Sequence, residues 1–564
     1  MGAQSRFLLW ALILPLHVAA QGGGEGRTLA PERREAPKIR PSSGQLDFRL
    51  PDARSLLPPE GRLSSGLAIT VKHFEIVGST VFPEETLQAV AAPYLSRPIG
   101  SEDLDALRLR LTRLYVDAGY INSGAVIPDQ EIRAGSVTIR IVEGRLDRIE
   151  INGAHGFRED YLSARLLDAP DRPFRVSTLQ ERMQLLLQNP QIARVNAELA
   201  PGERLGSSVL RVNVSEAPRR TLGVALANDR APNVGAKRLE LFGALRNPLG
   251  LADSWTLRLG KTRGVDDVTA IGVVPLTASD TTLDLRYEQN ASQVTEAPFD
   301  VLDIDSRSRS LEVGVRHPVY RTLQQTLSVG AALAARESTT YLGGERFSFS
   351  PGVSDGRTRI AALRLSADWL DRGRDYVFSA RGVLSHGLNA LGATRNAGDL
   401  PDARFNALLL QLQWVQRLND AGATWQLRGD VQVAHNPLFA LEKFAVGGTS
   451  SVRGFRENQL MRDNGWTASA ELRWPVAHLA FPGFSTQPGD GQLAVALFAD
   501  VGEAWDRGGR KERLWSAGPG IRWDIAQDSH AQLYWAAARR DIAREHNDLQ
   551  DRGVHFRIVM QRPF

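Results

Sequence analysis

Between residues 218 and 564, apolar and polar side chains alternate along the chain with a period of two residues. Leu283, Leu285 and Tyr287 point to one side of such a segment, and the charged residues between them point to the other. The same alternation recurs in residues 408–415, 425–433 and 554–561. Because turn residues separate these segments, the pattern predicts a succession of β-strands, each with one apolar and one polar face.

The polar face of these strands favours a membrane barrel over a soluble sandwich. A sandwich buries its apolar face in a shared core, whereas an outer-membrane barrel turns that face to lipid and its polar face to a wet lumen. Large ionised residues lie opposite the apolar rows throughout residues 218–564. At roughly 20–24 residues per strand and connection, this length predicts a transmembrane β-barrel of about 16 antiparallel strands.

The first residues of the chain have the composition of a secretory signal peptide. Arg6 precedes an apolar stretch from Phe7 to Leu16, and the small residues Ala19 and Ala20 stand before a polar break at Gln21. The stretch is too short for a membrane anchor, so we expect a signal peptide over residues 1–20. Residues 21–66 are rich in Pro, Gly, Ser and Arg, and we expect a linker without a long helix there.

Two similar units lie between the linker and the strand-rich region, each with the order strand, helix, helix, strand, strand. In the first, residues 67–144, Ser101 is a suitable N-cap for a helix that stops at Gly119. The second, residues 145–217, repeats the order. A repeat of about 75 residues is too long for a solenoid and predicts two small α+β domains in tandem.

Composition excludes several classes of function. The 68 basic and 64 acidic residues are interspersed, which gives no basis for nucleic-acid binding. Cys is absent, which removes disulfides and thiolate metal sites. The 10 His lie singly, outside any recognisable Ser/His/acid setting, and no phosphate-binding Gly-rich loop is present. We therefore expect no enzyme activity, no cofactor and no metal site.

Two motifs in the strand-rich region carry the sharpest signal. The first lies between strands, is flanked by glycines and consists of Val452, Arg453, Gly454 and Phe455. The second alternates along one face of a strand and consists of Phe498, Asp500 and Gly502. In this order, behind two tandem α+β domains, they resemble the loop and strand motifs of the BamA-like outer-membrane superfamily.

The tandem domains carry a resemblance of their own. The relevant residues of the first domain are Tyr115, Gly119, Tyr120, Ile127 to Gln130, Gly135, Glu143 and Gly144. They resemble the polypeptide-transport-associated (POTRA) domain of two-partner secretion transporters of the ShlB/FhaC/HecB type. A generic α+β domain is the alternative. Residues 228–235 and 247–253 are similar to the first barrel hairpins of those transporters, so the resemblance covers residues 67–564.

The resemblance implies a 16-stranded barrel over residues 218–564, preceded by two periplasmic POTRA-like domains. In the family the loop folds back into the lumen, so Arg453 is expected to approach Asp500, whose carboxylate suits a guanidinium fork. Phe564 would be part of the C-terminal assembly signal, although Pro563 beside it departs from the usual pattern. Family members often place a plug helix in the pore, which the frequent prolines of the linker do not favour.

The implied function is that of a two-partner secretion translocator, which binds an unfolded exoprotein through its POTRA domains and conducts it through the barrel without ATP. An exposed sheet edge could receive the client as an added strand. The implied partners are a β-helical exoprotein of the adhesin, haemolysin or toxin type, outer-membrane lipids and the barrel-assembly machinery. The alternatives are an insertase for other barrels, an outer-membrane lipase or protease, and a passive porin.

Overall fold

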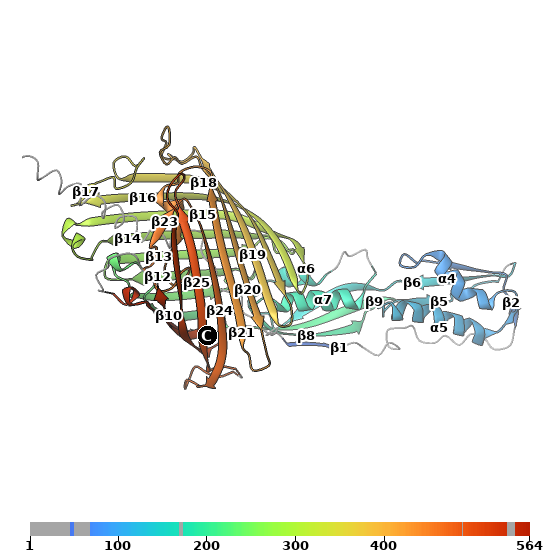
Figure 1. The fold of residues 1–564 in the computed structure, drawn as a ribbon. Helices are drawn as coiled ribbons and strands as arrows, with labels where there is room; N and C mark the ends of the chain where they lie inside the picture. The colour runs from blue at the N-terminus through green and yellow to red at the C-terminus, as the bar shows by residue number, and fades with distance from the viewer. Residues whose placement is uncertain (1–44, 50–67, 133, 168–172, 488, 539–547) are drawn as a thin grey trace, which may run out of the picture. The chain divides into compact units, whose positions relative to one another are not determined.

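The computed structural model describes residues 45–49, 68–132, 134–167, 173–487, 489–538 and 548–564 (Figure 1). The expected signal peptide lies outside these residues. The chain divides into two compact units, one containing residues 218–248 and 253–564, the other residues 41–217 and 249–252. No helix in the described part of the chain is long and apolar enough to cross a membrane.

The first α+β domain packs two helices on a three-stranded sheet. Its elements are β2 (Ile69–Thr70), β3 (His73–Val77), α4 (Glu84–Ala91), η1 (Ala92–Tyr94), β4 (Pro98–Ile99), α5 (Ser101–Asp117), β5 (Gly124–Val126) and β6 (Ser136–Val142). The sheet order is β3-β6-β5, and β2 pairs separately with β4. The expected N-cap at Ser101 is wrong, because Ser101 is already helical and Gly100 is the cap. The Gly100 amide donates to Asp103 at 3.1 Å, and a hydrogen bond from Arg97 together with this amide lowers the pKa of Asp103.

The second domain has a four-stranded sheet of order β1-β8-β9-β7. Its elements are β7 (Arg145–Asn152), α6 (Glu159–Leu166), α7 (Val176–Leu187), β8 (Ile192–Pro201) and β9 (Ser207–Glu216). The fourth strand, β1 (Gln45–Arg49), lies within the expected linker and pairs in parallel with β8. The prediction of a linker over residues 21–66 missed this strand. Leu46 and Phe48 alternate with exposed residues and pack against the domain core, which explains the strand.

The C-terminal region closes into a barrel, as predicted (Figure 1). The barrel has 16 antiparallel strands when the two-residue β17 is counted with β16 and β28 with β27. The last strand pairs with the first. The strands are β10 (Arg220–Ala227), β11 (Arg238–Arg246), β12 (Ser254–Lys261), β13 (Val265–Pro275), β14 (Thr282–Gln293), β15 (Ile304–Arg321), β16 (Gln325–Leu342), β17 (Glu345–Arg346), β18 (Arg357–Arg372), β19 (Tyr376–Leu388), β20 (Asn406–Arg417), β21 (Thr424–Ala434), β24 (Asn464–His478), β25 (Gln492–Trp505), β26 (Glu512–Ala526), β27 (Ser529–Trp535), β28 (Ala537–Ala538) and β29 (Val554–Pro563). Short 3-10 helices in the connections are η2 (Pro232–Val234), η3 (Phe299–Leu302), η4 (Ala440–Glu442) and η5 (Gln550–Arg552).

The two faces of the barrel wall differ in the way the alternation predicts. On β20, Leu410 and Leu412 are 45% and 50% exposed on the outer face, whereas Gln411 and Gln413 are 8% and 7% exposed on the inner face. The same division holds on the other side of the barrel, where buried Asp267 accepts hydrogen bonds from two lumen arginines. An apolar exterior and a polar interior suit a wall between lipid and an aqueous lumen.

Glu143, from the POTRA motif, organises the loop between β3 and α4. Its carboxylate accepts hydrogen bonds from the Thr80 and Val81 amides at 2.6 and 2.9 Å and from the Tyr115 hydroxyl at 3.2 Å. Burial raises the pKa of Tyr115, so this hydroxyl keeps its proton and remains a donor. Ser79 lies 2.7 Å from the same hydroxyl. The motif residues therefore tie the helix α5 and the end of β6 to one loop.

We expect Glu143→Gln to loosen this loop, because the neutral amide accepts weaker hydrogen bonds and presents only one oxygen. Hydrogen bonds to a charged group contribute about 1.5–3 kcal/mol, so amide hydrogen exchange in residues 79–82 should accelerate roughly tenfold to a hundredfold. Mass-spectrometric exchange on the full chain measures this. Glu75→Gln is the control, since Glu75 accepts from Thr138 and does not contact the loop. Equal exchange in both variants would show that Glu143 does not hold the loop.

Candidate functional site

A hairpin between β21 and β24 lies inside the barrel. Its strands, β22 (Phe444–Val446) and β23 (Leu460–Arg462), pair with each other and not with the wall. We call residues 444–462 the lumen hairpin; its tip carries the Val-Arg-Gly-Phe motif. Val452 and Phe455 are 0% and 1% exposed, because they pack in an apolar cluster with inward-facing wall residues.

The tip of the lumen hairpin is braced by its own polar groups. The Ser451 hydroxyl accepts a hydrogen bond from the Gly447 amide at 2.8 Å and donates one to the Gly447 carbonyl at 3.0 Å. The Glu457 carboxylate accepts from the amide and hydroxyl of Thr449 at 2.7 and 2.6 Å. A turn fixed in this way holds the Arg453 side chain in one direction.

Arg453 meets Asp500 on the inner face of β25. The Arg453 Nε and Nη2 groups donate to the two carboxylate oxygens at 2.7 and 2.9 Å, and its backbone amide donates to Oδ2 at 3.0 Å. The residues are 4% and 3% exposed. This is a bidentate, buried, charge-assisted pair with one extra main-chain bond. Removing one partner of a buried pair typically costs about 3–5 kcal/mol, because the other charge is left uncompensated.

Wall residues complete the surroundings of the guanidinium. Its carbon lies 3.7 Å from the ring centroid of Phe498 and 4.7 Å from that of Tyr534, which are cation–π distances. Glu471 on β24 pairs with Nη1 and accepts the Tyr534 hydroxyl at 2.9 Å. Ser469 bridges, accepting from Arg453 at 3.2 Å and donating to the Asp500 carboxylate at 2.6 Å.

Two glycines of the motifs make room for this contact. Gly454 has φ +84°, and a Cβ there would lie 2.5 Å from the Cβ of Ala536. A Cβ on Gly502 would lie 2.7 Å from a methyl of Val446 in the lumen hairpin. The Gly454 amide also donates to His555 Nε2 at 2.9 Å. All seven motif residues thus meet at one place, with the loop motif against the strand motif.

Further anchors hold the lumen hairpin. Arg456 pairs with Asp551 at 2.7 Å and with Glu296 at 2.8 Å. At the base, Glu442 accepts hydrogen bonds from Arg336 and Arg364, both at 3.0 Å. Sequence reasoning missed these partners, as it missed Glu471, Tyr534 and His555. Of these contacts, only that of Arg456 had a signal in the sequence, because Arg456 directly follows Phe455 of the motif.

Phe564 lies apart from the lumen hairpin. It follows β29 and exchanges two main-chain hydrogen bonds with Arg220, at 2.9 and 3.1 Å. Its side chain is 57% exposed. Pro563 remains within β29 opposite Thr221, so its missing amide does not end the pairing of the first and last strands. Phe564 thus belongs to the barrel seam. The other motif residues meet inside the barrel around the Arg453–Asp500 pair, and we call this contact the latch.

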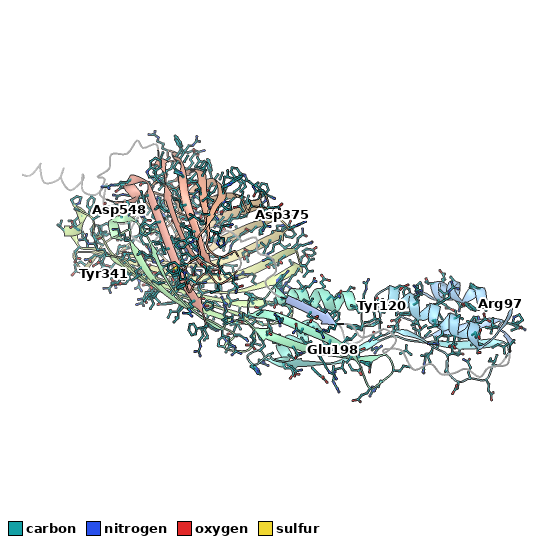
Figure 2. The ribbon with its side chains drawn as sticks, turned by 90° about the horizontal axis from the view of Figure 1, so that it is seen from below. Arg97, Tyr120, Glu198, Tyr341, Asp375 and Asp548 are labelled. Atoms are coloured by element: carbon teal, nitrogen blue, oxygen red, sulfur yellow. The ribbon has the colours of Figure 1, made fainter. Side chains whose placement is uncertain are left out.

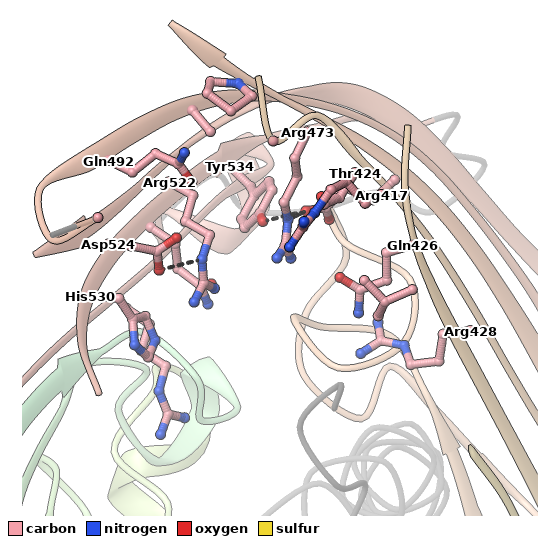
Figure 3. Close-up of a pocket in the computed structure, with 18 of the residues that line it drawn as sticks. Arg417, Thr424, Gln426, Arg428, Arg473, Gln492, Arg522, Asp524, His530 and Tyr534 are labelled. Atoms are coloured by element: carbon pink, nitrogen blue, oxygen red, sulfur yellow. Dashed lines mark hydrogen bonds and ion pairs between the residues drawn. The ribbon is translucent and has the colours of Figure 1, made fainter. Parts of the chain in front are cut away.

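A cavity of about 700 Å³ lies beside the latch. It extends toward the end of the barrel at which β10 begins and β29 ends. Thr449, Ser450 and Arg453 of the lumen hairpin line it. Polar side chains from the strands point into it, among them Arg417, Gln426, Arg428, Arg473, Arg522 and His530 (Figure 3). The Arg522 guanidinium donates to Asp524 at 2.9 Å. A cavity with this lining favours water and polar main chain over an apolar ligand.

Comparisons with known proteins agree with this architecture. A family model for the haemolysin secretion/activation protein ShlB/FhaC/HecB matches residues 206–523, and one for the ShlB-type POTRA domain matches residues 69–144. The outer membrane transporter CdiB of Escherichia coli is 25% identical over 445 residues, 74% of this chain and 71% of that protein. The hemolysin transporter protein ShlB of Serratia marcescens is 24% identical over 384 residues, 65% of each chain. The solved structure of CdiB from Escherichia coli has the same fold, with a TM-score of 0.64 at 21% identity, covering 89% of this chain and 92% of that one.

We expect Asp500→Asn to release the lumen hairpin, because Arg453 loses its bidentate charged partner. Since the chain has no Cys, a single Val452→Cys substitution reports the position of the tip. The buried thiol should resist maleimide in the parent background and react at least about tenfold faster when Asp500→Asn is added, given a loss of about 3–5 kcal/mol.

Asp267→Asn is the matched control for this experiment. Asp267 is also a buried lumen carboxylate held by two arginines, Arg230 and Arg238, but neither belongs to the lumen hairpin. The control should leave the thiol protected. Equal reactivity in the two variants would mean that the Arg453–Asp500 pair does not keep the tip in place.

Proposed function

Because the chain belongs to the haemolysin secretion/activation protein family ShlB/FhaC/HecB, we propose that it translocates a secreted exoprotein in an unfolded state through its barrel lumen. Its barrel lies in the bacterial outer membrane and its POTRA domains lie in the periplasm, and it acts as a two-partner secretion transporter. One relative is a hemolysin transporter, which supports a protein cargo. We propose a cargo of the haemolysin, adhesin or toxin type.

The polar lumen is the observation that carries the proposed route. An unfolded chain exposes amides and carbonyls that must stay hydrogen-bonded as it crosses a membrane. The cavity beside the latch offers arginine, glutamine and carboxylate side chains for that purpose. Apolar side chains line the outer face of the wall instead, where an unfolded main chain would remain unsatisfied.

The latch sets the resting position of the lumen hairpin along this route. The tip lines the cavity, and its base is anchored on β16 and β18 through Glu442. The hairpin therefore extends from one side of the lumen to the other, and the client must pass beside it or displace it. We propose that the Arg453–Asp500 pair is the contact that holds the tip of the hairpin beside the cavity.

The energy for transport comes from the client in this proposal. The periplasm has no ATP, and the sequence has no nucleotide-binding loop. An exoprotein that folds into a stable β-structure outside the cell cannot slide back through the lumen. Folding free energies of about 5–15 kcal/mol for a domain are sufficient to bias the direction of crossing.

The edge of β8 is the proposed receiving site for the client. Main-chain pairing with β8 already holds β1, a segment of the chain's own N-terminal region. Leu46 and Phe48 contribute two half-buried apolar contacts, and Asp47 and Arg49 are exposed. A client segment with alternating apolar residues could replace β1 with the same contacts, which is the usual mode of strand addition.

We expect Arg453→Ala to reduce export, because the hairpin loses the anchor that fixes its tip. The amount of exoprotein in the medium should fall about tenfold or more, consistent with the loss of a buried ion pair. Arg238→Ala is the control, since Arg238 is a buried lumen arginine paired with wall carboxylates only. Undiminished export by Arg453→Ala, at normal barrel levels in the outer membrane, would refute the role of the latch.

The paired substitution Leu46→Ser and Phe48→Ser should open the β8 edge. Losing two half-buried apolar contacts weakens β1 by about 1–2 kcal/mol, so the full-length transporter should bind an exoprotein fragment roughly fivefold to thirtyfold more tightly. Asp47→Ser with Arg49→Ser is the control on the exposed side of the same strand. Surface plasmon resonance measures the affinity of the parent protein and of both double variants for the exoprotein fragment. Equal affinities for all three proteins would exclude the β8 edge as the receiving site.

A further inference from the structure

Four arginines lie close together on the outer face of the barrel wall, on strands β15 and β18 with β16 between them. In one row across the strands, Arg307 is opposite Thr339, which is opposite Arg357. In the next row the sequence is Arg309, Glu337 and Arg359. With the usual spacings of strands and of alternate residues, the four side chains mark a rectangle of about 7 by 10 Å.

These side chains face outward, because they share a face with the exposed apolar residues of the same strands. Leu311 and Val313 follow Arg309 at two-residue steps and are 49% and 40% exposed, and Leu365 on β18 is 47% exposed. On β15, the intervening Ser308 and Ser310 are buried on the lumen side. The arginines are therefore on the lipid side of the wall.

The cluster lies where the apolar surface ends, on the extracellular side. β10 starts at the periplasmic end, next to the POTRA domains in the chain, and successive strands alternate in direction. β15 is the sixth strand and runs back toward the periplasm, so its first residues are at the extracellular end. Tyr341, beside the cluster, and Asp375, in a periplasmic turn, lie at opposite ends of the barrel (Figure 2).

The four arginines have only one carboxylate within their two rows. Glu337 accepts a hydrogen bond from Arg357 Nε at 2.7 Å and lies 3.6 Å from Arg359 Nε. Arg359 Nε is buried and has no hydrogen-bond partner among the described residues. Within the same part of the chain, neither Arg307 nor Arg309 pairs with a carboxylate; Arg307 lies 5.5 Å from the Tyr341 ring centroid.

The surrounding wall is balanced in charge. In the next row toward the loops, Asp305 and Arg346 flank Tyr341, and Arg346 pairs with Asp355. On other strands, outward-facing Lys261 pairs with Asp266 at 2.6 Å, and Arg513 pairs with Glu503 at 2.7 Å. The two arginine rows of β15 and β18 have no such balance, because Glu337 is their only carboxylate.

We propose that these four arginines bind the phosphorylated sugar head of lipopolysaccharide, the glycolipid of the outer leaflet. Guanidinium groups bind phosphate oxygens through paired N–H donors, and basic clusters at the rim of a membrane domain bind lipid head groups. The acyl chains then lie on the apolar rows below, formed by Leu311 and Val313 of β15 and Leu333 of β16. Charge complementarity and position together select this lipid, since the cluster is at the height of the outer-leaflet head groups.

Native mass spectrometry of the full-length transporter in detergent tests the site with lipid A that carries two phosphates. The parent protein should retain this lipid, and Arg309→Gln with Arg359→Gln should bind it about tenfold less. Lys261→Gln with Arg513→Gln removes two outward cations at the same end and should leave binding unchanged. Equal loss in both double variants would overturn the proposal.

Two probes of the parent protein make the result independent of how the variants fold. Dephosphorylated lipid A should bind about tenfold less well than the phosphorylated form, and equal binding would overturn the proposal. Inorganic phosphate at millimolar concentration should not displace the lipid, because the acyl chains contribute to binding. Complete displacement would identify a site for free anions and contradict a lipid site.

Discussion

The buried ion pair between Arg453 and Asp500 is the contact on which the interior of the barrel depends. A guanidinium removed from water requires a charged partner and satisfied donors. Asp500, Glu471 and Ser469 supply these, and Phe498 and Tyr534 supply a flat aromatic surface. Because these groups come from the wall, the tip of the lumen hairpin has one favourable position. The pair therefore couples a loop to the strands that form the passage.

The wall makes this pair possible through simple alternation. Most strand residues that face lipid are apolar, and their neighbours along the strand then face the lumen, where charge is tolerated. Asp500 faces the lumen together with Phe498 and Gly502, because the three residues alternate along β25, while Leu497 on the outer face meets lipid. The outward arginines of β15 and β18 depart from this pattern and lie where the apolar surface ends.

The sequence predicted the parts of this structure that repeat locally. Alternation predicted the barrel strands, and element order predicted two α+β domains. The resemblance to the BamA-like superfamily predicted that Arg453 approaches Asp500. The remaining contacts of the latch connect residues that are far apart in the chain: Arg456 pairs with Glu296, 160 positions away. No local periodicity encodes such a contact, because only closure of the barrel brings the strands together.

Two smaller features escaped prediction for other physical reasons. β1 has five residues, and prolines near it in the sequence suggested a linker. Pairing with β8 and packing of the half-buried Phe48 against the domain core nevertheless stabilise an extended strand. The cap of α5 was placed one residue late, because Asp103 binds the Gly100 amide and leaves Ser101 inside the helix. In both cases a tertiary or side-chain contact outweighed local composition.

Passage of the client through the lumen can be measured with a photo-crosslinking residue at neighbouring positions of β21. Gln426 lines the cavity (Figure 3). The next side chain, Leu427, points to the opposite face of the strand, because side chains alternate along it. During export, a photoreactive residue at position 426 should crosslink to the exoprotein, and one at position 427 should not. Crosslinks from position 427 alone, or equal yields from both positions, would contradict transport through the interior of the barrel.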